Sequence, residues 1–102
     1  MVRIIIFSFT LRVAPNVDAG IEVCYDADGE HLASLRIKDG GFIQSWNKQC
    51  VSGPCAGKQV HAGDCILAVN GETKAKSIMK RCKSDILLLK FTIHRGGACM
   101  NN

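Results

Sequence analysis

The chain has 102 residues, of which 47% are hydrophobic and only 2 are proline, and this composition predicts a single folded domain rather than a disordered chain. The formal net charge of +4 is modest, and one Trp and one Tyr provide few rings on which bases could stack, so no nucleic-acid partner is expected. No window approaches the ~20 apolar residues that a membrane-spanning helix needs.

Three β-strands are predicted in the first third of the chain. Apolar and polar side chains alternate over residues 7–13, which is typical of a strand with one buried face, and Pro15 follows its end. The apolar residues 2–6 are interpreted as an extension of this strand rather than as a signal peptide. The same alternation predicts strands over 21–25 and 33–37.

A short helix is predicted after the third strand. Asp39 is the expected N-cap, because its carboxylate can accept a hydrogen bond from a free amide of the first turn. Phe42, Ile43 and Trp46 fall on one face, which predicts that the helix packs on the sheet. Residues 47–61 contain glycine and proline breakers and are expected to be irregular.

A buried strand and a tight turn are predicted next. Cys65–Val69 is an unbroken apolar run, as expected for a strand covered on both faces. Asn70-Gly71 indicates a two-residue hairpin turn, because both residues tolerate the positive φ that such a turn requires. Only a brief strand is expected at residues 72–73.

A second helix and a last strand complete the predicted order. Apolar residues recur at helical spacing over 75–82, and alternation predicts a strand over 87–93. The predicted fold is therefore mainly β with two helices (α+β): a small, partly open antiparallel barrel or sandwich of five to six strands, capped by two helices. We expect residues 1–6 to be an N-terminal strand extension, 7–95 the domain and 96–102 a flexible tail.

The segment from Gly63 to Gly71 reads Gly-Asp-Cys-Ile-Leu-Ala-Val-Asn-Gly and resembles the G-D-x-I-x-x-V-N-G core of PDZ domains. The predicted order of elements is also similar to that of this family, and the resemblance covers about residues 7–95. It implies a PDZ-like domain that is not an enzyme. Such a domain binds the C-terminal or an internal segment of a partner protein between its second strand and second helix, by β-strand addition. An adaptor or scaffold in intracellular signalling is thus expected.

The resemblance also assigns binding residues. The family's carboxylate-binding loop corresponds to Asp18-Ala19-Gly20-Ile21, in which the amides of residues 19–21 would hold the ligand carboxylate. Arg12 would be the nearby basic residue. Asp18 stands where the family has glycine and is expected to weaken carboxylate binding, while Ala19 is smaller than the usual residue.

The rest of the expected groove comes from the second strand and the second helix. Its peptide-binding residues are Ala19, Gly20, Ile21, Glu22, Val23, Ala75, Met79, Cys82 and Arg12. Ala75 suggests a hydrophobic ligand residue at the start of the helix. For Met79 and Cys82, plain core packing is the alternative to lining the terminal pocket.

A basic run in the predicted second helix suggests a different function. It comprises Lys74, Lys76, Lys80, Arg81 and Lys83. The simple interpretation is a solvated helix face. The alternative is a PDZ-like scaffold with a vestigial groove that contacts anionic lipid through these residues.

The six cysteines are interpreted as reduced thiols of an intracellular, cytoplasmic protein, with membrane association as the alternative. Cys50, Cys55, His61 and Cys65 have the ligand types of a structural zinc site, although their spacing fits no common zinc knuckle. A small zinc-stabilised module is thus a third hypothesis, and no metal or cofactor is expected in the leading one. His31 and His94 are expected at the surface.

Overall fold

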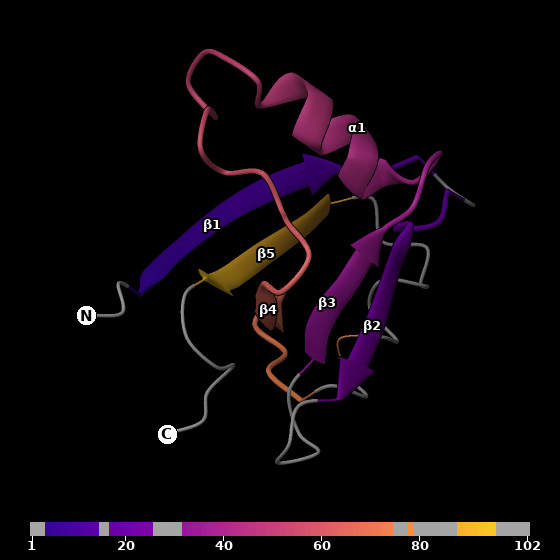
Figure 1. The fold of residues 1–102 in the computed structure, drawn as a ribbon, viewed down its shortest axis with the longest axis vertical. Coiled ribbons are helices and arrows are strands. Elements are labelled where there is room, and N and C mark those ends of the chain that lie inside the picture. The colour runs from indigo at the N-terminus through magenta and orange to yellow at the C-terminus, as the bar shows by residue number, and fades with distance from the viewer. Residues whose placement is uncertain (1–3, 15–16, 26–31, 75–77, 79–87, 96–102) are drawn as a thin grey trace.

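The computed structural model describes residues 4–14, 17–25, 32–74, 78 and 88–95. Five strands and one helix lie within these residues. They are β1 (Ile5–Arg12), β2 (Ile21–Tyr25), β3 (Leu32–Ile37), α1 (Phe42–Gln49), β4 (Cys65–Val69) and β5 (Leu88–Arg95). The strands form a single antiparallel sheet in the order β1-β5-β4-β3-β2 (Figure 1). The mainly β class is confirmed.

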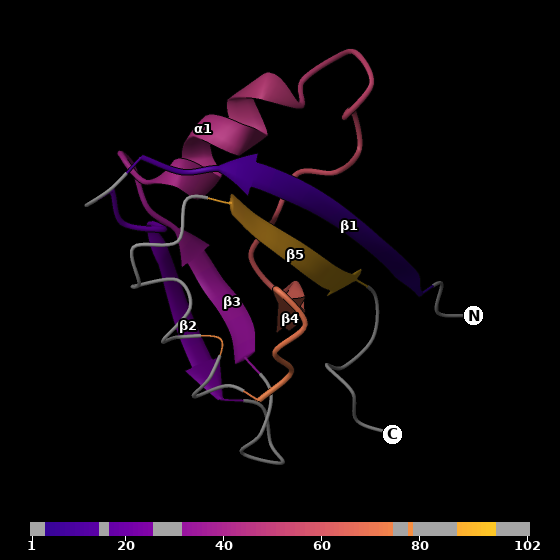
Figure 2. The same cartoon turned by 180° about the vertical axis from the view of Figure 1, so that it is seen from behind.

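The core is built on one face of this sheet. Phe7 on β1 pairs with Ile93 on β5, Ile93 with Ile66 on β4, and Ile66 with Leu32 on β3, so the register aligns an apolar row across four strands. The helix α1 lies across one end of the sheet, beside the ends of β1 and β3 (Figures 1 and 2). As predicted, Phe42 and Ile43 are buried and Trp46 packs against the core.

The Asn70-Gly71 hairpin is confirmed. Both residues have positive φ, 52° and 83°, and Val69 and Glu72 exchange two backbone hydrogen bonds of 3.0 Å. The Asn70 side chain also accepts a hydrogen bond from the Lys90 amide at 2.7 Å, which ties the turn to β5. The brief strand predicted at 72–73 is reduced to one bridge between Val69 and Glu72.

The prediction that Asp39 caps α1 is wrong. The N-cap is Gly41, which has no side chain to donate or accept. The first-turn amides of Phe42 and Ile43 instead donate to the carbonyl oxygens of Asp18 and Ala19, at 3.0 and 3.2 Å. A distant loop thus satisfies the helix end, and the Asp39 carboxylate accepts a hydrogen bond from the Gln44 amide group at 2.6 Å.

The predicted second helix falls almost wholly outside the described residues. Only Ile78 belongs to the described part; it is buried in the core, and its amide donates to the Lys74 carbonyl at 2.9 Å, the spacing of one α-helical turn. The predicted tail 96–102 also lies outside. So do the candidate residues Ala75, Met79 and Cys82 and the basic residues Lys76, Lys80, Arg81 and Lys83.

Two expectations about single side chains are wrong. Cys65 is disulfide-bonded, whereas Cys24, Cys50 and Cys55 are free thiols. Disulfides are rare in reducing compartments, so the cysteines no longer argue for an intracellular location. His94 is buried rather than exposed, and it lies opposite the buried Cys65 in the β4–β5 register.

Within the described segments, no helix combines the length and the hydrophobicity needed to cross a bilayer.

Candidate functional site

The second strand is an outer strand of the sheet. Within the described part of the chain, β2 has a strand neighbour on one side only, which is β3. The side chains of Ile21 and Val23 are half-buried and pack against the core, and the pairing with β3 shifts register between Glu22 and Val23. An outer strand directs backbone donors and acceptors away from the sheet, where another strand can pair with them.

The loop that leads into β2 is fixed on the start of α1. As noted above, the Asp18 and Ala19 carbonyls cap the helix, and the Gly20 carbonyl accepts from the Lys38 amide at 2.8 Å. Three successive carbonyl oxygens are therefore committed to the protein itself.

Gly20 and Gly41 make this close fit possible. A Cβ atom on Gly20 would lie 2.8 Å from the Gly41 Cα, and one on Gly41 would lie 2.5 Å from the Ala19 carbonyl oxygen. Gly20 also has a φ of 71°, which side chains disfavour. The sequence interpretation identified Gly20 and missed Gly41.

Asp18 occupies the site that the resemblance assigns to a ligand carboxylate. Its Oδ2 accepts a hydrogen bond from the Gly20 amide at 3.1 Å. Asp18 was expected to weaken carboxylate binding by its charge alone. In the structure, the Asp18 carboxylate also binds the Gly20 amide, one of the three amides that the resemblance assigns to the ligand.

Two further candidate residues are Glu22 and Arg12. Glu22 forms an exposed ion pair with Arg36 on β3, with 2.5 Å between Oε2 and Nη2. Arg12 is exposed at the end of β1, the other outer strand. The structure therefore places the candidates of residues 19–23 in the loop and at the start of β2, and it places Arg12 at the end of a different strand.

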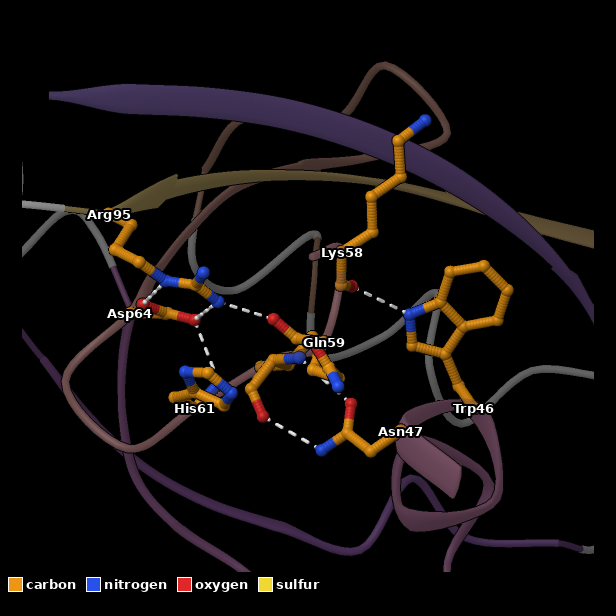
Figure 3. Close-up of polar contacts among 8 residues, drawn as sticks. Trp46, Asn47, Lys58, Gln59, His61, Asp64 and Arg95 are labelled. Carbon is orange, nitrogen blue, oxygen red and sulfur yellow. Dashed lines mark hydrogen bonds and ion pairs between the residues drawn. The ribbon is translucent and has the colours of Figure 1, made fainter. Parts of the chain in front are cut away.

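A second cluster of polar contacts centres on an ion pair between the buried Asp64 and the half-buried Arg95, and only its acidic partner was noted in the sequence. The carboxylate of Asp64 accepts from Arg95 Nε and Nη2, both at 2.9 Å, and from the His61 amide at 2.8 Å (Figure 3). Arg95 Nη2 also donates to the Gln59 carbonyl, and its guanidinium lies 5.1 Å from the centre of the Phe7 ring. The hydrogen bonds with Asp64 raise the pKa of Arg95 above its usual value.

The last turn of α1 forms hydrogen bonds with residues 58 and 60, on either side of the Gln59 carbonyl that binds Arg95. The Asn47 side chain accepts from the Val60 amide and donates to the Val60 carbonyl, each at 2.8 Å, and Trp46 Nε1 donates to the Lys58 carbonyl at 2.9 Å (Figure 3). Residues 58–64 are thus held between α1 and β5. These contacts give the segment a structural role.

The zinc hypothesis does not fit this arrangement. Cys65 is disulfide-bonded, so its sulfur is not a free thiolate ligand. Among the described residues, no group of three or more His, Cys, Asp or Glu side chains is placed to hold a metal ion.

Comparisons with known proteins give no independent assignment: no protein-family model and no curated protein sequence matches the chain.

Proposed function

We propose that this protein is a non-catalytic interaction module that binds an extended peptide by adding it as a strand to the outer edge of β2. The observation that carries the proposal is the position of β2 as an outer strand, directly after a loop whose carbonyls are anchored on α1. Main-chain hydrogen bonds would then give affinity, and side-chain pockets would give selectivity. The PDZ-like segment Gly63–Gly71 supports the same function.

Asp18 argues for an internal segment, rather than a free C-terminus, as the preferred ligand. A terminal carboxylate at Gly20 would have to displace the Asp18 carboxylate or stand beside it. Two like charges about 4 Å apart repel by ~1 kcal/mol in water and by ~4 kcal/mol in a partly desolvated site. An internal peptide carries no such charge and can still pair with β2.

The proposal is tested by mapping amide shifts of labelled protein with a pool of extended peptides acetylated and amidated at their ends. The largest shifts are expected at residues 21–24, because their backbone lies at the outer edge of β2, where the peptide would pair. Peptides of the same sequence with N-methylated backbone amides are the matched control, since they lose the donors that a strand ladder needs. Shifts confined to β1, or equal binding of the methylated peptides, would exclude strand addition at β2.

Replacing Asp18 with alanine is expected to create a preference for free C-termini. The Gly20 amide is then released, and the ligand carboxylate can gain a charge-assisted hydrogen bond of about 1.5–3 kcal/mol. The ratio of the Kd for the amidated peptide to that for the free acid should rise by about tenfold or more, as measured by fluorescence anisotropy.

Two variants separate the hydrogen bond from the charge. Asp18→Asn removes the charge and keeps an acceptor for the Gly20 amide, so it should change the ratio less than Asp18→Ala. Asp39→Asn removes an equal charge from a neighbouring turn that does not bond Gly20, and it should leave the ratio nearly unchanged. If Asp18→Ala also leaves the ratio unchanged, the loop does not bind carboxylates.

A second candidate function follows from the same Asp18 contact. Because the Gly20 amide already binds the protein's own carboxylate, the groove beside it could be vestigial. The domain would then act as a scaffold that contacts anionic lipid through its basic residues. Of these residues the described part includes Lys74, which is exposed. Sedimentation with anionic vesicles, weakened by salt, together with no peptide binding, would favour this function.

A further inference from the structure

Two free thiols meet at the C-terminal end of α1. Cys50 directly follows the helix and is 0% exposed, whereas Cys55 is partly exposed. The turn between them brings Cys55 back to the helix end, where its Sγ donates to the Gln49 carbonyl at 3.5 Å. Gln49 is the residue next to Cys50. Both cysteines are reduced in the structure.

The two sulfurs also differ in chemical character. Burial, followed by a hydrogen bond with the Cys55 thiol, raises the pKa of Cys50 to about 12, against the weaker opposing charge of Lys58. Cys50 is therefore shielded from external reagents. Cys55 is the sulfur that an external reagent reaches first.

We propose that Cys50 and Cys55 form a site of reversible oxidation, in which Cys55 reacts with a hydroperoxide and Cys50 resolves the product as a disulfide. This site lies at the opposite end of α1 from the loop 18–20, and it stands independently of peptide binding.

The chemistry balances in two steps. The Cys55 thiolate attacks a peroxide oxygen, so that an S–O bond forms, the O–O bond breaks and the hydroperoxide leaves as water or an alcohol. The Cys50 sulfur then attacks the Cys55 sulfur, the S–S bond forms, the S–O bond breaks, and the Cys50 proton leaves with the hydroxide as water. The two thiols lose two electrons, and the hydroperoxide gains them.

The structure gives this bond a local consequence. The Cys50 amide donates to the carbonyls of Trp46 and Asn47, both at 3.1 Å, so Cys50 forms the C-cap of α1. Trp46 and Asn47 in turn hold the segment 58–60. A disulfide across 50–55 would covalently close the turn that connects these two elements.

Trypsin provides a direct readout. Cleavage after Lys48 and Lys58 releases residues 49–58, which contain both cysteines and no other. The intact protein is treated with hydrogen peroxide and its free thiols are blocked with N-ethylmaleimide. After digestion, the mass of the 49–58 peptide is measured by mass spectrometry. The expected product is an unblocked peptide that has lost two hydrogen atoms and that regains them with dithiothreitol.

Two variants complete the test. In Cys50→Ser the resolving sulfur is missing, so Cys55 should accumulate as a sulfenic acid that dimedone traps. In Cys24→Ser, the matched control, the oxidised peptide should form as in the unchanged protein, because Cys24 lies on β2. The proposal is overturned if the wild-type peptide carries two maleimide groups after peroxide treatment, or if Cys55 pairs with a cysteine other than Cys50.

Discussion

Replacing Arg95 with methionine is expected to lower the free energy of unfolding by about 3–5 kcal/mol, because it leaves a buried carboxylate without its cation. The Asp64 side chain is only 3% exposed, and Arg95 donates two hydrogen bonds to it. The substitution also removes the bond from Arg95 to the Gln59 carbonyl. Urea unfolding at neutral pH, followed by the fluorescence of the single tryptophan, Trp46, measures the loss.

The chain offers a matched control for this substitution. Arg36 also pairs with a carboxylate, that of Glu22, but the two side chains are 67% and 43% exposed. Arg36→Met should therefore change the free energy of unfolding by no more than about 1 kcal/mol. Equal losses in the two variants would mean that the Asp64–Arg95 pair is no stronger an anchor than a surface pair.

A double variant separates the unpaired charge from the lost packing. Adding Asp64→Asn to Arg95→Met replaces the stranded carboxylate with a neutral amide, which costs less to bury and can still accept from the His61 amide. Part of the lost stability should return. If the double variant is less stable than Arg95→Met alone, the buried charge is not the cause of the loss.

The elements that the sequence predicted correctly are those encoded by neighbouring residues. Alternation over 7–13 correctly indicates the buried face of that segment, whereas the strand predicted over 21–25 forms without alternating burial, and Tyr25 is exposed. The hairpin follows from Asn70-Gly71, since the turn needs positive φ at both positions and these two residues tolerate it.

The features that were missed depend on partners that are distant in the chain. Nothing in the sequence near Gly41 indicates that the carbonyls of residues 18 and 19 will cap α1. Arg95 is separated from Asp64 by 31 positions, so the motif containing Asp64 does not identify it. The disulfide at Cys65 was missed because all six cysteines were interpreted as reduced thiols of an intracellular protein.

The candidate site was predicted in outline, and one local signal within it was overlooked. Aspartate commonly bonds a backbone amide two residues further on, and Asp18 has that relation to Gly20. The sequence could therefore have indicated the occupied amide as well as the repulsive charge. The outward placement of the β2 edge, by contrast, follows from the order of the five strands that the structure describes.

Replacing Gly41 with alanine is expected to lower the free energy of unfolding by about 3 kcal/mol or more, because the new methyl group meets backbone atoms that cannot move aside independently. Its Cβ would lie 2.5 Å from the Ala19 carbonyl oxygen and 2.5 Å from the Gly20 Cα. The backbone of Gly41, with φ −90° and ψ 172°, suits any residue. Backbone strain therefore adds nothing to the steric cost, and urea unfolding measures the loss.

The adjacent glycine is the control that isolates this contact. Gly40 has a φ of 88°, and a Cβ there would meet nothing within 4 Å, so Gly40→Ala should cost only the ~1–2 kcal/mol of a strained backbone. The amide shifts of Gly20 and Ile21 should move strongly in Gly41→Ala and little in Gly40→Ala, since only the first substitution pushes the loop away from α1. If both variants lose the same stability and leave Gly20 unshifted, the loop does not rest on the helix. The geometry proposed for the start of β2 would then lose its support.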